Sequence, residues 1–198
     1  MLCLVTDTDP RWAALAIADL PTALADHAHC EMKAATNALS LATRWPAPVE
    51  VARALTAVAE EELRHFREVL ALLEARGLEL GRPEVDAYAA ALRSAAMSSG
   101  DKTPKGSLAE RLLVGALIEA RSCERFRLLA DALAARGDEL AAFYDELFAC
   151  EARHYTTMVD LAIEVTGREP RVRERLAVLA RAEGDIAARL GVRPTIHG

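Results

Sequence analysis

Apolar residues recur at helical spacing along most of the chain, in segments that proline, glycine and short polar runs separate. The pattern predicts four long helices, over residues 21–44, 48–77, 107–137 and 138–167. Pro46 and Pro48 are expected to end the first of these helices, and Gly77 and Gly167 to stop the second and the fourth. Shorter helices are predicted over residues 12–19, 84–97 and 170–190, before a tail of eight residues. The chain is therefore expected to be all-α.

The lengths of the connections predict how the long helices are arranged. The linker after residue 44 is short, so the first two helices are expected to be antiparallel neighbours. Residues 98–106 form the clearest loop and, with the short helix over 84–97, make one long crossover to the third helix. Two helix pairs joined by one long connection are the layout of a ferritin-like four-helix bundle.

Two helix starts have recognisable caps. Ser107 and Glu110 have capping-box spacing, in which each side chain satisfies an unpaired backbone N–H. The third long helix is therefore expected to begin at Ser107, and Asp138 is the expected cap of the fourth.

Length and composition agree with one helical unit. At 198 residues the chain is expected to form a single domain over residues 1–198. It is 52% hydrophobic but only 5% aromatic, and the residues that dominate it lose little on entering a helix. No run approaches the roughly 18 uncharged apolar residues that a membrane span requires, and the N-terminus lacks a basic segment followed by an apolar run. We expect a cytoplasmic protein with no membrane partner.

The cysteines and the net charge bear on two further classes, disulfide-linked proteins and nucleic-acid binders. Cys3, Cys30, Cys123 and Cys150 form no CxxC pair and are expected to be reduced, partly buried thiols. The net charge of −6 argues against a general nucleic-acid binder, although it leaves room for a local basic patch. Buried glutamates that bind metal would leave the outer surface closer to neutral than this total suggests.

The most informative motif is Glu-x-x-His, which occurs twice. Glu62 and His65 form one copy in the second long helix, and Glu151 and His154 form the other in the fourth. Residues three apart in a helix lie on one face, so each copy can present a carboxylate and an imidazole to the same ion. For either copy alone, an exposed glutamate beside a hydrogen-bonded histidine is the commoner explanation.

The phase of the helices strengthens the metal hypothesis. Both motifs lie on the apolar stripe of their helix, between Val58 and Val69 and between Leu147 and Met158, so they are expected to point inward. The first and third long helices each place one glutamate on such a stripe, Glu31 and Glu119. Nearly the same number of residues separates each lone glutamate from its partner motif, which indicates a duplicated helical hairpin.

This combination is the ligand set with which ferritin-like carboxylate proteins hold two iron or two manganese ions. The candidate ligands are Glu31, Glu62, His65, Glu119, Glu151 and His154. Four ionised carboxylates in an apolar core would be costly alone, whereas two divalent ions cancel their charge. Mixed carboxylate and imidazole ligands with open positions favour iron, and manganese remains the alternative.

Other polar residues near the candidate ligands are expected to play lesser roles. Glu124 is predicted to lie on a different face from Glu119, and Glu60 and Glu61 are predicted to be exposed neighbours of Glu62. His27, one turn before Glu31, either supports that carboxylate from behind or packs in the core.

Five segments, in order along nearly the whole chain, resemble one known family. They are residues 26–35, 61–66, 85–89, 118–126 and 151–155. The family is the tRNA 2-methylthio-N6-isopentenyladenosine hydroxylases, often called MiaE, within the ferritin-like di-iron carboxylate superfamily. The segment over residues 118–126, IEARSCERF, is the most distinctive of the five.

The resemblance implies hydroxylation of the isopentenyl side chain of a modified adenosine next to the tRNA anticodon. The implied reaction uses two iron ions, O2 and two external electrons. No dinucleotide fingerprint and no iron–sulfur cysteine spacing occurs in the sequence, so a separate reductase or electron-transfer protein is predicted as a partner.

A tRNA substrate would require positive charge around the site. The candidate contacts are Lys102, Lys105, Arg121, Arg125, Arg168, Arg171, Arg173 and Arg175, of which Arg121 and Arg125 lie in the most distinctive segment. Three other functions remain open. They are a di-iron hydroxylase of another apolar, quinone-like substrate, a ferritin-like protein that oxidises or stores iron, and a metal-free helical interaction module.

Overall fold

The computed structural model describes residues 2–45 and 47–197. These residues form seven α-helices and no strand, which confirms the all-α expectation. The helices are α1 (Trp12–Ala18), α2 (Leu20–Arg44), α3 (Val49–Ala75), α4 (Ala87–Ser99), α5 (Pro104–Ala134), α6 (Leu140–Thr166) and α7 (Glu169–Leu190). Pro46, which was expected to help end the first long helix, lies outside the described residues.

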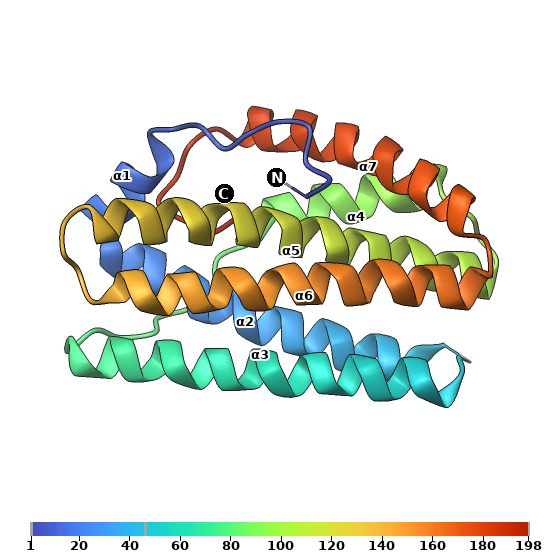
Figure 1. The fold of residues 1–198 in the computed structure, drawn as a ribbon, viewed down its shortest axis with the longest axis horizontal. Helices are drawn as coiled ribbons and strands as arrows, with labels where there is room; N and C mark the ends of the chain where they lie inside the picture. Colours follow the sequence, from blue (N-terminus) through green and yellow to red (C-terminus); the bar gives the residue numbers. More distant parts are fainter. Residues whose placement is uncertain (1, 46, 198) are drawn as a thin grey trace.

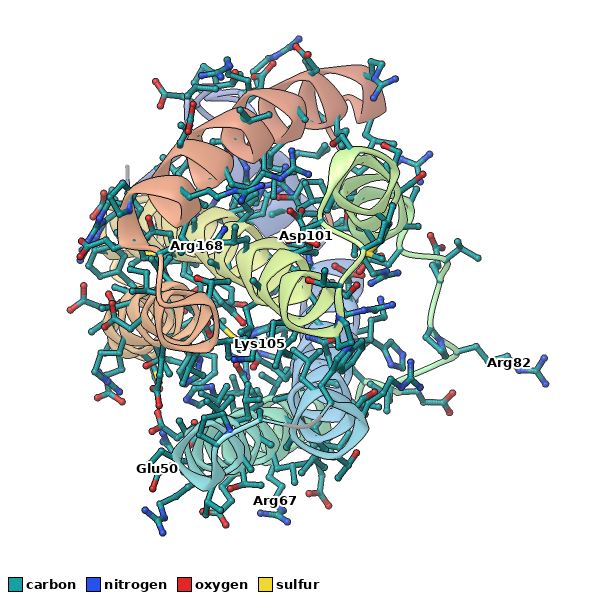
Figure 2. All side chains as sticks on the ribbon, turned by 90° about the vertical axis from the view of Figure 1, so that its right-hand side faces the viewer. Glu50, Arg67, Arg82, Asp101, Lys105 and Arg168 are labelled. Carbon is teal, nitrogen blue, oxygen red and sulfur yellow. The ribbon has the colours of Figure 1, made fainter. Side chains whose placement is uncertain are left out.

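The four long helices form two antiparallel pairs. α2 packs along α3, and α5 packs along α6 (Figure 1). Seen end-on, the α2/α3 pair lies below the α5/α6 pair, and α4 and α7 form a further layer above α5 and α6 (Figure 2). α4 belongs to the long crossover between α3 and α5, as the loop lengths predict. The ferritin-like arrangement is therefore confirmed.

The start of α5 differs from the prediction. The helix begins at Pro104 and not at Ser107, because Thr103 acts as N-cap and its Oγ1 accepts a hydrogen bond from the Gly106 N–H at 3.1 Å. Proline suits the first helical position, where its missing N–H leaves no hydrogen bond unmade. Glu110 is not part of a capping box, since its carboxylate accepts hydrogen bonds from Arg175. With α4 extending to Ser99, the loop is also shorter than expected.

The other boundaries shift by a few residues. α6 begins at Leu140 and its N-cap residue is Glu139, not Asp138. Asp138, one residue earlier, still accepts a hydrogen bond from the Leu140 N–H at 3.0 Å. Gly167 follows α6 with φ 63°, the left-handed conformation that favours glycine at a helix end. Over the described residues, no helix combines the length and the apolar character needed to cross a membrane.

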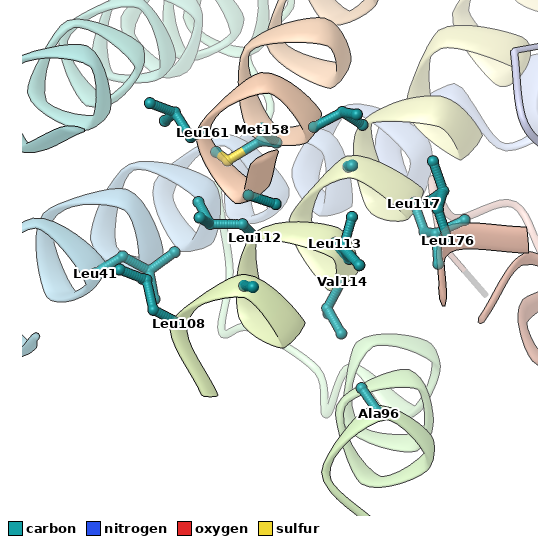
Figure 3. Packing of buried hydrophobic residues seen from close by; sticks show 14 of the residues in the cluster. Leu41, Ala96, Leu108, Leu112, Leu113, Val114, Leu117, Met158, Leu161 and Leu176 are labelled. Atoms are coloured by element: carbon teal, nitrogen blue, oxygen red, sulfur yellow. The ribbon is translucent and has the colours of Figure 1, made fainter. Parts of the chain in front are cut away.

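The hydrophobic core lies on both sides of a polar centre. One cluster fills the half of the bundle that α4 and α7 cover, and it combines Leu112 and Leu113 of α5 with Leu41, Ala96, Met158 and Leu176 from four other helices (Figure 3). A second cluster fills the other end and includes Trp12, Phe126, Leu129 and Tyr144. Burying each of these large side chains contributes about 1.5–3 kcal/mol. The polar centre between the clusters contains Glu119 of α5.

A buried ion-pair network ties α5 to α7 and to the N-terminal segment. Arg121 donates two parallel hydrogen bonds to the Glu183 carboxylate, both at 2.9 Å. It also forms an ion pair with Glu124 and donates to the Thr6 carbonyl oxygen. Arg121 is only 1% exposed, so the prediction that it contacts RNA is wrong. Glu124 faces this network and Thr8, on a different face from Glu119 as predicted.

Arg125 is also buried, which makes it the second incorrect RNA candidate. Its guanidinium donates to the carbonyl oxygens of Thr195 and Ile196 and lies 5.0 Å from the centre of the Trp12 ring. Burial, together with the charge of Arg121, lowers the pKa of Arg125 to about 10. Its role is to hold the C-terminal tail against α5.

The C-terminal tail is packed into the bundle. The Trp12 indole N–H donates to the Thr195 carbonyl oxygen at 2.9 Å, and the Ile196 N–H donates to Asp26. The His197 ring stacks on Tyr88, and its Nε2 lies 2.9 Å from the Ser122 Oγ in a hydrogen bond. Burial lowers the pKa of His197 to about 4, so this ring is neutral near pH 7.

The neutral His197 predicts a measurable dependence of stability on pH. Unfolded His197 takes up a proton below about pH 6.5, but the folded ring does so only near pH 4, so stability falls as pH drops through this window. Between pH 7 and pH 5 the wild type should lose about 2 kcal/mol more than a His197→Gln variant. Urea unfolding of both proteins at these pH values measures the difference, and parallel pH curves would refute it.

Candidate metal centre

The structure brings all six candidate ligands together in the middle of the bundle. Each of the four long helices contributes from its inward face, and all six side chains are buried. Their ligand atoms form two groups of four, and the atoms within each group lie within 4.8 Å of one another. The first group is Glu31, Glu62, His65 and Glu151, and the second is Glu62, Glu119, Glu151 and His154.

The two groups share Glu62 and Glu151. Glu31 and His65 belong to the first group alone, and Glu119 and His154 to the second alone. Such an arrangement could hold two cations side by side, each with its own glutamate and histidine and with two carboxylates available to both. In the sequence, only helical phase supported Glu119 as a ligand. In the structure Glu119 is buried and belongs to the second group.

Four buried polar atoms in the centre have no hydrogen-bond partner among the residues described, which bears on whether cations fit there. They are Glu62 Oε1, His65 Nδ1, Glu151 Oε2 and His154 Nδ1. His154 Nδ1 lies 2.9 Å from Glu62 Oε1 and 3.4 Å from Glu151 Oε2, and His65 Nδ1 lies 3.5 Å from Glu62 Oε2. Buried polar atoms are nearly always partnered, so four unsatisfied ones facing each other fit a site for metal ions.

The electrostatics of the centre lead to the same conclusion. Burial, and then the charges of Glu151 and Glu62, raise the pKa of Glu119 well above its usual value. Burial opposes protonation of His65, but the nearby Cys150 thiol and the carboxylates of Glu31 and Glu62 outweigh it and raise the pKa of His65 to about 12. Without metal, the centre therefore balances its negative charge with protons, which divalent cations would displace.

His27 supports Glu31 from behind. Its Nε2 lies 2.7 Å from Glu31 Oε1, and its ring packs against Phe126 and Tyr144 with centroids 4.9 and 5.6 Å away. Both roles that the sequence left open are therefore present. Burial alone would raise the pKa of Glu31, but the hydrogen bond with His27 and the nearby His65 ring lower it to about 2.

Glu61 was expected to be only an exposed neighbour, and this prediction is wrong. Its carboxylate is partly exposed, but it accepts a hydrogen bond from the Cys150 thiol at 3.0 Å and lies 3.3 Å from His154 Nε2. A carboxylate on one ring nitrogen fixes which nitrogen faces a metal, and here His154 Nδ1 faces Glu62 and Glu151. Glu60 is exposed, as predicted. All four cysteines are free thiols, also as predicted.

A cavity of about 190 Å³ lies against the centre and is lined by residues of α2, α3, α4, α5 and α6. This is far more than the ~10–15 Å³ that one water molecule needs. Glu31, Glu62, Glu119 and Glu151 line one part of it. Its apolar lining includes Ala34, Ala89, Val114, Ile118 and Met158, and its cationic lining is Lys33, Arg93 and Arg111. The sequence singled out none of these three cations, because helical phase alone does not show which exposed residues surround a cavity.

The family model described as tRNA-(MS[2]IO[6]A)-hydroxylase (MiaE) matches residues 2–198. The chain belongs to the MiaE family. A Pseudomonas putida relative named tRNA 2-(methylsulfanyl)-N(6)-isopentenyladenosine(37) hydroxylase is 39% identical over 155 residues, which cover 78% of this chain and 72% of the relative. A Salmonella typhimurium relative with the same name is 27% identical over 215 residues, covering 85% and 76%. The resemblance to MiaE in the sequence is thus confirmed.

One solved structure is similar to this MiaE-family chain over its whole length. It is titled "Protein 43 with aldehyde deformylating oxygenase activity from Synechococcus", and it matches with a TM-score of 0.87 and 35% identity. The match covers 100% of this chain and 96% of the other. The fold is therefore shared with a protein titled as an oxygenase of aldehydes.

Proposed function

We propose that this chain is a di-iron, O2-dependent monooxygenase. Its substrate would be 2-methylthio-N6-isopentenyladenosine near the anticodon of tRNA, hydroxylated on the isopentenyl side chain. The observation that carries the proposal is the buried six-residue centre in a chain of the MiaE family. We further infer that residues 1–198 act as one ferritin-like domain and that the reaction takes place in the cytoplasm, where tRNA is available.

The proposal assigns a role to each candidate ligand. Glu31 and His65 would hold one iron ion, Glu119 and His154 the other, and Glu62 and Glu151 would contact both. When bound, the iron pair would supply the reduction of O2 and the oxidation of a C–H bond. His27 and Glu61 would hold Glu31 and His154 in place from outside the ligand set.

The cavity beside the centre suits the reacting part of this substrate. Its apolar lining can receive a branched five-carbon group and exclude water from it, with the four carboxylates next to that group. The reaction takes one O2, two electrons and two protons; one oxygen atom becomes the new hydroxyl group and the other leaves as water.

The two electrons would come from a separate reductase or electron carrier. The sequence has no dinucleotide fingerprint and no iron–sulfur spacing that could supply them. Purified, reduced protein given O2 and substrate should therefore complete about one turnover per iron pair and then stop. Continued turnover with no added electron source would contradict this part of the proposal.

The most direct test in cells is nucleoside analysis of tRNA from strains with and without the gene. We expect the hydroxylated isopentenyl nucleoside to disappear from the deletion strain and its unhydroxylated precursor to accumulate. Reintroducing the gene should restore the hydroxylated form. If the hydroxylated nucleoside persists in a deletion strain that has no redundant enzyme, the substrate assignment is wrong.

A second candidate function is oxygenation of an aldehyde, because the Synechococcus structure carries that activity in its title. The two functions separate in one assay, in which iron-loaded protein with an electron donor receives either a fatty aldehyde or the modified tRNA. Release of formate from the aldehyde with no hydroxylation of tRNA would favour the second candidate. An iron-storage function would instead require a large hollow assembly, which a measurement of particle mass detects.

A further inference from the structure

Two arginines beside the metal centre have no acidic partner. Arg93 of α4 is exposed and Arg111 of α5 is partly buried, and both line the cavity that contains the four carboxylates. Neither forms an ion pair within residues 2–45 and 47–197, whereas Lys33, the third cation of the cavity, lies 3.5 Å from Asp86. Unpaired guanidinium groups at a cavity are available to bind an anion.

Arg111 provides the more specific observation. Its Nε is buried and has no hydrogen-bond partner among the described residues, and its guanidinium lies 5.1 Å from the centre of the Trp45 ring. The aromatic ring positions the guanidinium but leaves the Nε–H unsatisfied, which is unfavourable for a buried donor. An anionic oxygen at this position would satisfy it.

The two arginines border the same hollows. Besides the main cavity, both line a second hollow next to it, together with Ser94, Met97, Glu110 and Val114. Glu110 does not compete for them, because Arg175 already binds it with hydrogen bonds of 2.8 and 2.9 Å. Of the three cations that line the main cavity, these two arginines are the ones without an acidic partner among the described residues, so the anion should stay beside them.

We propose that Arg93 and Arg111 bind a backbone phosphate of the tRNA anticodon loop next to the modified adenosine. This inference rests on the proposed function, because it takes the base that enters the cavity to be part of tRNA. A splayed-out base carries its own phosphate with it, so a phosphate site is expected at the point where the base enters. Guanidinium groups suit this role because their N–H groups match pairs of phosphate oxygens.

This site replaces the RNA contacts that the sequence suggested. Lys105, Arg168 and Arg171 line a different hollow, together with Asp101, and no candidate metal ligand lines that hollow. Lys105 and Arg168 lie at the end of the bundle that faces the viewer in Figure 2. Arg175 is bound to Glu110, and Arg173 to Glu169. Lys105, Arg168 and Arg171 therefore line a hollow other than the cavity at the metal centre.

The test measures binding of the full-length, metal-free protein to a synthetic anticodon stem–loop that carries the modified adenosine. Fluorescence anisotropy over a range of salt concentrations compares the wild type with the double variant Arg93→Gln/Arg111→Gln. We expect the Kd to rise about 10- to 100-fold and the salt dependence of log Kd to weaken by ~0.7 for each phosphate that the variant no longer neutralises. Arg53→Gln/Arg67→Gln removes the same charge from exposed positions on α3 and should bind like the wild type.

The same variants separate a failure of this inference from a failure of the proposed function. With iron and an electron donor, Arg93→Gln/Arg111→Gln should lose more of its kcat/KM with the stem–loop than with the free modified nucleoside, which has no phosphate. Its KM for the stem–loop should rise while kcat stays the same. If the wild type hydroxylates neither substrate, the proposed function fails, and the binding data still test the phosphate site. An unchanged Kd in this variant, or weaker binding confined to Lys105→Gln/Arg168→Gln, would overturn the inference.

Discussion

A Glu62→Ala variant is expected to lose the iron pair and with it nearly all hydroxylation. Glu62 belongs to both groups of candidate ligands, so its removal weakens both ion positions and not just one. Iron content after anaerobic loading should fall from about two ions per chain to below one. Activity should fall by more than the ~10–100-fold that follows from removing a supporting residue. Iron should also no longer raise the melting temperature of this variant, because a ligand stabilises only a protein that binds it.

Glu60→Ala is the matched control for this experiment. Glu60 lies two residues earlier in the same helix but is exposed and outside both groups. The control should bind two irons, hydroxylate tRNA and be stabilised by iron like the wild type. If Glu62→Ala retains two irons, or if both variants lose them equally, the assignment of Glu62 is wrong.

An Arg121→Met variant is expected to show the largest decrease in stability. Methionine fills much of the same volume but leaves the carboxylates of Glu124 and Glu183 buried without their cation. Breaking a buried pair in this way costs about 3–5 kcal/mol. For a chain of this length that corresponds to a melting temperature lower by roughly 6–20 °C. Thermal and urea unfolding of the metal-free protein measure the effect without contributions from iron.

Arg127→Met provides the comparison on the same helix. Arg127 pairs with Asp145 at 2.7 Å, but their side chains are 32% and 59% exposed, so water screens the pair and removing it should change stability by no more than about 1 kcal/mol. Equal effects of the two substitutions would contradict the buried network. An Arg121 variant of normal stability that fails to bind tRNA would instead restore the RNA role that the sequence suggested.

The long helices and the candidate ligands could be predicted because both depend on local patterns. A stripe with helical period shows which face of a helix points inward, and Glu62 and His65 lie on such a stripe within one turn of each other. Four inward-facing stripes in a bundle must meet, so the convergence of residues from four helices follows from the pattern. The start of α5 was predicted at Ser107, and this was wrong because Thr103–Pro104 is also a valid helix start. Pairing with Arg175 of α7 takes Glu110 out of the capping box, and Thr103 caps the helix instead.

The residues that sequence reasoning missed depend on contacts between distant segments. Arg121 is a cation in the most distinctive segment, which made it a candidate RNA contact. Nothing in the sequence indicates that Glu183 of α7 lies against it. His197 lies in a tail with no periodic pattern, and its neighbour Ser122 is far away along the chain. Glu61 is out of phase with the inward stripe, but its side chain reaches across to α6. None of these contacts could have been found from helical phase.

Anomalous diffraction at the iron edge, from crystals grown anaerobically with ferrous iron, locates the metal directly. Two peaks per chain are predicted, one among Glu31, Glu62, His65 and Glu151 and the other among Glu62, Glu119, Glu151 and His154. A single peak, or iron held instead by Glu61, Cys150 and His154, would contradict a di-iron centre built from these six side chains.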